Sequence, residues 1–284
     1  MTLIYWKGKL LPPEKVSLSP LNTGLFYGES LFETLPIYRG GALFFTEHLM
    51  RLKKGCDFLH WPYLPKENFE KAIRLFRSEN GITSDFLIRF NLVQKLDDLS
   101  PKTGFSSRRP ELFAVIRPLR HDPNRFLPFR AKVGVSPWKA IGGEMVPNHF
   151  KLPFYLTTRS VLRDHPDWDE ILRLNNHGRV VDGGSSTPMW FDGKSVHVPS
   201  LKLGGLESVT RGKILQLCSD LGLPVRESAW KPENVFQKGE LFFVGSGVGV
   251  MSASHLLGRR IKSSGFFAVR LWQHYRKWAR EKGF

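Results

Sequence analysis

The chain has 284 residues, 41% of them hydrophobic, and 42 Lys and Arg against 26 Asp and Glu give it a formal charge of +16. This composition excludes a disordered chain, and the length favours two medium-sized globular domains. The basic residues are spread along the sequence without a recognition motif, so we expect no nucleic-acid partner despite the charge.

The sequence shows neither a targeting signal nor a metal-binding pattern. No stretch reaches the roughly 18 uncharged apolar residues of a membrane span, and the N-terminus lacks the apolar region of a secretion signal. We therefore expect a cytoplasmic protein that does not contact membranes. Its two cysteines, Cys56 and Cys218, lack the spacing of a metal site and are predicted to be buried thiols.

The N-terminal part is predicted to contain short strands and two helices. Thr46 is a candidate cap for the first helix, and Gly81 is expected to end the second. In 86–93 two residue sets alternate, which predicts a strand with one buried face. The expected elements are strands 2–6, 31–38 and 42–45, with a turn at 39–41 between the last two, helices 47–54 and 66–80, and strands 86–93 and 111–116.

The C-terminal part is predicted to form hairpins with interspersed helices. Residues 117–130 are rich in Pro, Arg, His and Asp, a composition that suits a linker. The predicted domains are therefore 1–120 and 131–284, joined by a linker at 121–130. Further expected elements are strand 131–136, a helix that ends at Asp164, hairpins around 176–178 and 192–193, helix 209–221 capped by Ser208, and strand 241–244.

Several familiar catalytic patterns are absent. The glycine-rich 245–249 has GxGxG spacing, which does not match the dinucleotide fingerprint, although its backbone N–H groups suit a single phosphate. Residues 208–211 at a helix start offer a second place for an anion. Ser185 lacks the GxSxG context of a hydrolase, and His48 is more typical of a structural histidine than of a metal ligand.

Lys151 is the candidate for chemistry that the residues themselves suggest. It lies in an apolar and aromatic segment, 146–156. A lysine there is either a surface residue whose aliphatic stem covers apolar neighbours, or an amine kept out of water so that its pKa falls and it acts as nucleophile or base. The segment alone leaves both readings open.

Five motifs, in order along nearly the whole chain, carry a family resemblance. They are LFYGESLFET at 25–34 with TEHLMRL at 46–52, NHFKLPFYL at 148–156, GRVVDGG at 178–184, LESVTR at 206–211 and ELFFVGS at 240–246. With these motifs the chain resembles the fold-type IV pyridoxal-phosphate family, which comprises class IV aminotransferases and 4-amino-4-deoxychorismate lyase. Each motif is weak alone, but five in register are specific.

The resemblance implies a fold, a cofactor and an assembly. The fold is a two-domain α+β architecture with an N-terminal α/β sandwich and a C-terminal pseudo-barrel, and pyridoxal 5'-phosphate lies in the cleft between the domains. A homodimer is expected because active sites of the family borrow loops from the partner. Lys151 falls on the Schiff-base lysine, which also shuttles the Cα proton of the substrate.

The remaining site residues are carried over by position. Arg51 matches the arginine that pairs with the cofactor phosphate, and Asp182 falls where most members have a Glu bonded to the pyridine nitrogen. Tyr155 is the candidate partner of the ring's phenolic oxygen. Phosphate-binding positions are Ser208, Val209, Thr210, Gly245 and Ser246, and substrate-binding candidates are Tyr27, Phe32 and Arg89. Asp182, Thr187 and Ser208 depart from the family's Glu, Asn and Gly.

The implied activity is transamination between an amino acid and a 2-oxo acid. The alternative is elimination of pyruvate from aminodeoxychorismate, which gives 4-aminobenzoate and uses the same lysine. A third interpretation is a catalytically degraded relative with a binding role, because three site positions depart from the family. The segment 94–100 matches the substrate loops of neither activity, so the sequence does not name the substrate.

Overall fold

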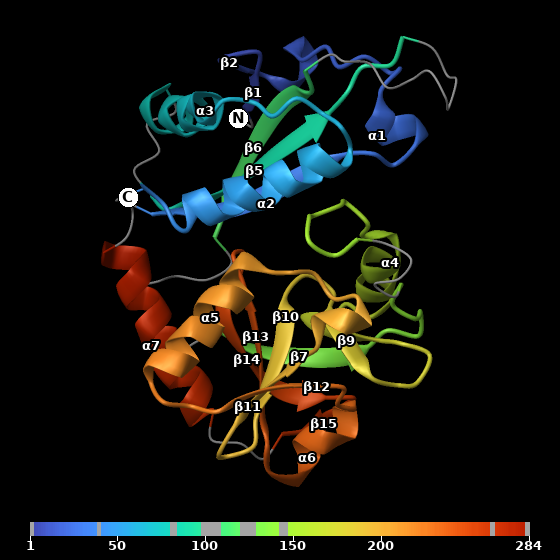
Figure 1. Ribbon diagram of the computed structural model, residues 1–284, viewed down its shortest axis with the longest axis vertical. Coiled ribbons are helices and arrows are strands. Elements are labelled where there is room, and N and C mark those ends of the chain that lie inside the picture. Colours follow the sequence, from blue (N-terminus) through green and yellow to red (C-terminus); the bar gives the residue numbers. More distant parts are fainter. Residues whose placement is uncertain are drawn as a thin grey trace. The chain divides into compact units, whose positions relative to one another are not determined.

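The computed structural model describes residues 3–38, 41–79, 84–97, 109–119, 129–141, 147–261 and 265–281. The chain forms two compact units (Figure 1). Unit 1 comprises Met1–Leu119, His149–Pro153 and Arg280–Phe284, and unit 2 comprises Arg120–Asn148 and Phe154–Ala279. Residues 39–40 of the turn predicted at 39–41, the helix end at Gly81 and residues 121–128 of the predicted linker lie outside the described residues.

Unit 1 is built on a six-stranded antiparallel sheet with the order β2-β1-β6-β5-β3-β4. The predicted strands at 31–38 and 86–93 are confirmed as β3 and β5. Pro36 is tolerated within β3 because it needs no N–H toward the β4 side, where its carbonyl accepts from Leu43 N–H at 3.1 Å. The strands are β1 (Ile4–Trp6), β2 (Lys9–Leu11), β3 (Leu31–Tyr38), β4 (Gly41–Ala42), β5 (Phe86–Val93) and β6 (Glu111–Pro118).

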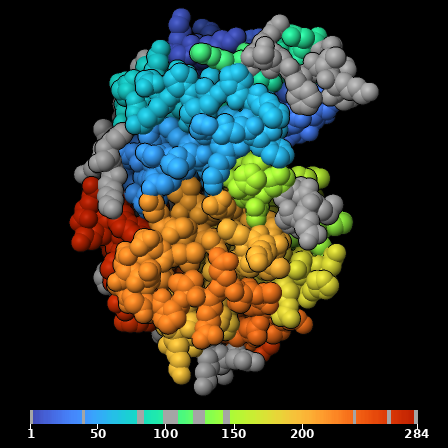
Figure 2. Space-filling view, in the orientation of Figure 1, coloured from blue at the N-terminus to red at the C-terminus, as the bar shows by residue number. Residues whose placement is uncertain are grey.

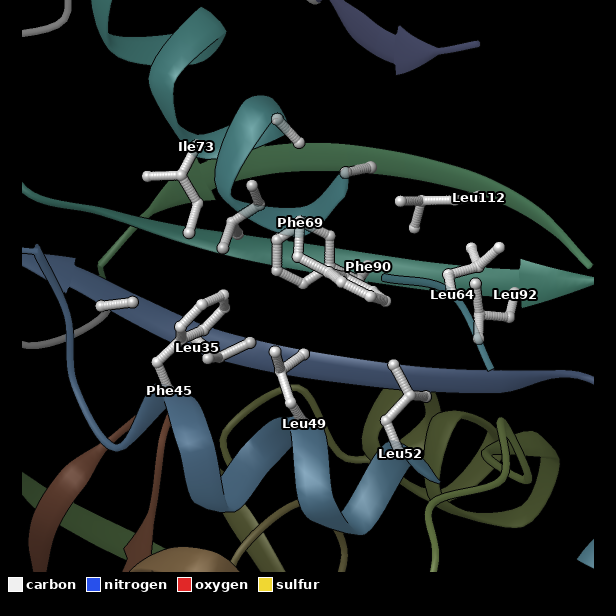
Figure 3. Close-up of a cluster of buried hydrophobic side chains, with 14 of the residues drawn as sticks. Leu35, Phe45, Leu49, Leu52, Leu64, Phe69, Ile73, Phe90, Leu92 and Leu112 are labelled. Atoms are coloured by element: carbon white, nitrogen blue, oxygen red, sulfur yellow. The ribbon is translucent and has the colours of Figure 1, made fainter. Parts of the chain in front are cut away.

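Two long helices supply the core of unit 1. They are α2 (Phe45–Phe58) and α3 (Lys66–Glu79), preceded in the chain by the single turns η1 (Pro13–Lys15) and α1 (Thr23–Phe26). Figure 3 shows side chains of both long helices meeting those of three strands in one cluster. Its labelled members are Leu35, Phe45, Leu49, Leu52, Leu64, Phe69, Ile73, Phe90, Leu92 and Leu112.

Three local predictions for unit 1 are wrong. Of the strand expected at 42–45 only Ala42 lies in a strand, and Phe45 already begins α2. The cap of α2 is Phe44, in a left-handed conformation with φ 56°, so the helix begins before Thr46 and the Thr46 hydroxyl does not cap it. Strand β5 also lacks a solvent face, because Leu87 and Val93 are buried along with the other set. Its pairing with β3 and β6 covers only its two edges, and the burial of side chains from both sets shows that both faces of the strand are covered as well.

Unit 2 contains a nine-stranded mixed sheet with the order β12-β11-β10-β13-β14-β7-β8-β9, in which β15 also pairs with β14. The sheet curls, since β9 at one end lies against β10 and β11 near the other. The strands are β7 (Arg130–Val135), β8 (Glu170–Leu174), β9 (Val180–Gly183), β10 (Thr187–Phe191), β11 (Val196–Pro199), β12 (Val225–Ser228), β13 (Glu240–Gly245), β14 (Gly249–Leu256) and β15 (Arg259–Arg260).

Helices pack against this curled sheet, and α5 and its flanking segments, coloured orange, form much of the surface of unit 2 in Figure 2. A carboxylate caps the first turn of the C-terminal helix α7. Glu240 Oε2 accepts from the N–H groups of Phe267 and Ala268 at 3.0 and 3.2 Å. The helices are α4 (Leu156–Asp164), η2 (Leu201–Leu203), α5 (Val209–Asp220), η3 (Pro232–Asn234), α6 (Val235–Lys238) and α7 (Phe266–Glu281).

Both cysteines are buried and free, as predicted. Burial raises the pKa of the Cys56 thiol to about 12 and that of Cys218 to about 11, so neither is a nucleophile near neutral pH. Among the described residues, no helix is both long and apolar enough to cross a bilayer.

Candidate cofactor and substrate site

Lys151 lies against the open edge of β3 in unit 1. Strand β4 pairs with only the last two residues of β3, and among the described residues no strand pairs with the first half of that edge. The N–H of Phe32 donates there to the carbonyl oxygen of Lys151 at 3.3 Å. The half-buried Lys151 side chain returns over the same strand, with Nζ 5.0 Å from the centre of the Phe32 ring. The amine therefore lies over the face of an aromatic ring.

A second cation lies over the same ring. Arg89 of β5 places its guanidinium carbon 3.8 Å from the Phe32 ring centre, and its Nε donates to Asn91 Oδ1 at 2.8 Å. These bonds fix the direction of a long side chain that would otherwise be mobile. The structure thus brings together the predicted residues Lys151, Phe32 and Arg89. Tyr27, at the end of α1, is 40% exposed.

Arg51 is held by a buried ion pair in the same unit. Its Nε and Nη2 donate to the two carboxylate oxygens of Glu33, each at 2.7 Å. His48, one helical turn earlier on α2, places Nδ1 2.6 Å from the same carboxylate. Glu33 is fully buried and the two partners nearly so. This fork-to-fork contact orients the guanidinium far more strictly than a single bond would.

Electrostatics keep this group in one protonation state near neutral pH. Burial raises the pKa of Glu33, but the charges and hydrogen bonds of Arg51 and His48 outweigh it and hold the pKa at about 2. Burial, together with the charges of Arg51 and Lys151, lowers the pKa of His48 by more than the Glu33 carboxylate raises it. We therefore assign an ionised Glu33 and a neutral His48 that donates its Nδ1–H.

Asp182 in unit 2 is fixed by two backbone donors. Its Oδ1 accepts from Gly183 N–H at 2.9 Å, and its Oδ2 accepts from Leu206 N–H at 3.0 Å. Gly205 permits this approach, because a Cβ at that position would lie 2.4 Å from the carbonyl oxygen of Val181. The two hydrogen bonds hold the Asp182 carboxylate in one orientation.

The start of α5 forms an anion-binding surface in unit 2. The N–H groups of Val209 and Thr210 lie in the first turn, and within the described part of the chain they have no backbone acceptor. The Thr210 hydroxyl lies 3.4 Å from that of Ser246, which follows Gly245 at the end of β13. Free amides, two hydroxyls and the positive end of a helix are suited to a phosphate.

Three further positions complete the placement of the predicted residues. Tyr155 is the residue that precedes α4, and Thr187 is buried at the start of β10. Ser208 caps α5, as predicted, with its hydroxyl accepting from Arg211 N–H at 3.3 Å. Among the described residues, no three His, Cys, Asp or Glu side chains are grouped so that they could hold a metal ion.

Comparison with known proteins gives the family. Residues 30–256 match the model for "Amino-transferase class IV". The chain belongs to the class IV aminotransferase family. It is 24% identical over 255 residues to aminodeoxychorismate lyase of Bacillus subtilis, covering 86% of this chain and 83% of the lyase. It is also 24% identical over 266 residues to a probable branched-chain-amino-acid aminotransferase of Thermotoga maritima, covering 93% of this chain and 89% of that protein.

The predicted fold class is confirmed by a solved structure of the same family. The branched-chain aminotransferase of the thermophilic archaeon Thermoproteus uzoniensis, solved with norvaline, superposes with a TM-score of 0.86 at 22% identity. The match covers 100% of this chain and 97% of that one. This class IV chain therefore has the fold-type IV architecture, with a curled mixed sheet and a separate antiparallel sheet.

Sequence reasoning missed the partners of Arg51. Glu33 stands at a core-facing position between Leu31 and Leu35, where a charge needs a buried counter-ion. That break in an apolar pattern was a usable signal. Its pairing with Arg51 and His48, three residues apart on a helix, was not visible in the sequence.

Substitution of Ser208 tests the departure from the family's Gly. The backbone at Ser208 is extended, with φ −76° and ψ 133°, so a side chain is accepted without strain. We expect Ser208→Ala to lower the free energy of unfolding by about 1 kcal/mol and Ser208→Gly by only a few tenths of a kcal/mol. Urea unfolding of the three proteins measures this, and equal losses in both variants would contradict the capping role.

Proposed function

We propose that this class IV chain is a pyridoxal-phosphate-dependent aminotransferase that moves an amino group between an amino acid and a 2-oxo acid. The observation that carries the proposal is the placement of the Lys151 amine over the Phe32 ring beside the Arg89 guanidinium. When bound, pyridoxal phosphate supplies an aldehyde that condenses with amines and a ring that accepts electrons from the substrate's Cα.

Three groups of unit 1 are suited to binding the cofactor and the substrate. Lys151 would anchor the cofactor through its amine and, once released, would take the proton from the substrate's Cα and deliver it to C4′ of the cofactor. Arg89 pairs with a carboxylate of the substrate, and its direction is already fixed by Phe32 and Asn91. Arg51 pairs with the cofactor phosphate while Glu33 and His48 hold it in place.

The groups of unit 2 are a second set of candidate cofactor ligands. The Asp182 carboxylate keeps the pyridine nitrogen protonated, which allows the ring to act as an electron sink. The phosphate is received by the N–H groups of Val209 and Thr210, the hydroxyls of Thr210 and Ser246 and the backbone at Gly245. Tyr155 is the proposed hydrogen-bond partner of the ring's phenolic oxygen. The departure to Asp is compatible with this role, because its carboxylate is held in one orientation by two backbone N–H groups.

The second candidate function is the lyase reaction on aminodeoxychorismate. It is favoured by the 24% identity with the Bacillus subtilis lyase, and the charge of +16 suits a dianionic substrate. Dicarboxylate substrates of aminotransferases are attracted in the same way. The charge therefore does not separate the two reactions.

Exposure to amino donors separates the proposed reactions. The protein is loaded with pyridoxal phosphate and mixed with D- and L-amino acids one at a time without a 2-oxo acid, while the cofactor spectrum is recorded. We expect at least one donor to convert the cofactor to its amine form and 2-oxoglutarate to reverse this. Release of 4-aminobenzoate from aminodeoxychorismate without such conversion assigns the lyase reaction instead. If neither response occurs, the chain is a degraded relative with a binding role.

We also propose that the protein works as a homodimer, as the family resemblance implies. Leu25 and Phe26 of α1 and the adjacent Tyr27 are 69%, 46% and 40% exposed, and together they form a short run of exposed large apolar side chains. Such a run is more typical of an interface than of a solvated surface.

A further inference from the structure

Glu170 is a buried carboxylate of unit 2 that none of the roles above uses. Its side chain is 1% exposed at the start of β8. Within the described residues, no Lys, Arg or His forms an ion pair with it. Burial raises its pKa by more than its hydrogen bonds lower it. An unpaired carboxylate in the interior is unfavourable unless its lone pairs are satisfied, so its bonds indicate what it does.

Three of its four hydrogen bonds come from one short segment, and the fourth comes from the next residue of its own strand. Oε1 accepts from the N–H groups of Ile171 and Gly184 at 3.0 and 2.9 Å. Oε2 accepts from the hydroxyls of Ser185 and Ser186 at 2.9 and 2.6 Å. Three consecutive residues of the turn between β9 and β10 are thus bound to a single side chain. A Cβ at Gly184 would lie 2.7 Å from Oε1, which shows how closely the turn and the carboxylate approach.

This turn connects two groups that we assign to cofactor binding. Asp182 precedes it directly, and Gly183 N–H donates both to Asp182 Oδ1 and to the carbonyl oxygen of Ser186. On its other side, Ser186 packs against Gly245, where an added Cβ would lie 3.3 Å from Ser186 Cβ. Gly245 in turn precedes Ser246, whose hydroxyl meets Thr210. Displacement of the turn would therefore move both the Asp182 carboxylate and the Gly245–Ser246 peptide.

We propose that Glu170 is a positioning residue, whose carboxylate fixes the 183–186 turn and so sets the direction of the Asp182 carboxylate and of the Gly245–Ser246 peptide. This role rests on the proposed function, because it concerns the groups assigned there to the pyridine nitrogen and the phosphate. Glu170 itself touches neither the cofactor nor the substrate. A displacement of about 1 Å in such a group is enough to lower the rate by about 100-fold.

Three variants separate positioning from bulk stability. Glu170→Ala removes all four bonds, Ser186→Ala removes the shortest one and keeps the packing against Gly245, and Glu170→Gln keeps one acceptor oxygen for the two N–H groups. In the Gln variant the serine hydroxyls rotate to accept from the amide nitrogen. Leu256→Ala is the matched control, since Leu256 is fully buried on β14 and has no bond to the turn.

The first measurement is the dissociation constant of pyridoxal phosphate by absorbance titration of the apo-protein. We expect Glu170→Ala to weaken binding about 10- to 100-fold and Ser186→Ala about 3- to 10-fold, with Glu170→Gln within about 3-fold of the unchanged protein. The second is amide hydrogen exchange without cofactor. It should rise at 183–186 and at Leu206 in the Ala variant, and Gln should restore protection.

Two results would overturn the positioning role. One is a Leu256→Ala variant that loses as much affinity as Glu170→Ala for the same loss of thermal stability. The other is a Glu170→Gln variant as weak as Glu170→Ala, which would assign the effect to the charge. If the unchanged protein binds no pyridoxal phosphate, the proposed function fails and this role fails with it, and the titration of that protein alone reveals it.

Discussion

Lys151→Ala is expected to abolish the visible absorption of lysine-bound pyridoxal phosphate and to lower turnover by about 1,000-fold or more. The variant loses the amine that anchors the cofactor and the base that moves the Cα proton, and proton transfer alone contributes roughly 100- to 10,000-fold. The measurement is an absorbance spectrum of the loaded protein together with single-turnover kinetics. In the unchanged protein, borohydride reduction followed by peptide mass spectrometry should place the pyridoxyl group on the peptide that contains Lys151.

Two control variants make the result specific. Lys151→Arg keeps a cation over the Phe32 ring but provides no amine for the cofactor, so it should be as inactive as Lys151→Ala. Lys9→Ala removes an exposed lysine of the same unit and should leave the spectrum unchanged. A pyridoxyl label on any other lysine, or full absorption in Lys151→Ala, would refute the assignment.

Glu33→Ala is expected to lower the free energy of unfolding by about 3–5 kcal/mol. It leaves the buried Arg51 guanidinium without its counter-ion, and an uncompensated charge in the interior is strongly unfavourable. Urea unfolding followed by circular dichroism measures the loss. Lys53→Ala breaks the exposed ion pair with Asp57 on the same helix and should change the free energy by less than about 1 kcal/mol.

A double variant distinguishes loss of the pair from loss of packing. In Glu33→Leu with Arg51→Met both charges are replaced by apolar side chains of similar length, so most of the stability should return. Cofactor affinity should not return, because the proposed phosphate contact of Arg51 is absent. Recovery of both properties would show that Arg51 holds the fold but not the phosphate.

The Glu33 carboxylate also makes the free energy of unfolding depend on pH. The pKa of Glu33 is about 2 in the folded protein against 4.5 for the free group. Its contribution is therefore fully present above pH 4.5 and is lost as the pH falls toward 2, about 3 kcal/mol in total. His48 acts in the same direction because its pKa is lowered on folding.

The pH test compares two proteins, because the two buried glutamates have opposite effects. Burial raises the pKa of Glu170, so its contribution falls as the pH rises through the ordinary range of a glutamate. Glu170 is present in both the unchanged protein and Glu33→Gln, so its contribution cancels in the difference between their free energies of unfolding. That difference should shrink between pH 5 and 2, and a difference independent of pH would contradict an ionised Glu33.

The sequence predicted much of the local structure, since local structure follows from patterns within a dozen residues. The strand at 31–38, the helix capped by Ser208 and the turn at Gly178 all lie where periodicity and turn chemistry indicate. The cap of α2 was missed because Phe44 adopts a left-handed conformation that few residues other than glycine adopt.

By itself, the sequence determined the family, the fold class and Lys151 as the candidate amine, because five motifs in register carry that information. Only the tertiary structure paired Glu33 with Arg51 and His48, and Glu170 with Ser185 and Ser186. Each of these partners lies 15 to 18 residues away along the chain. Whether such side chains meet depends on how a strand packs against a helix or a turn, which no local pattern specifies.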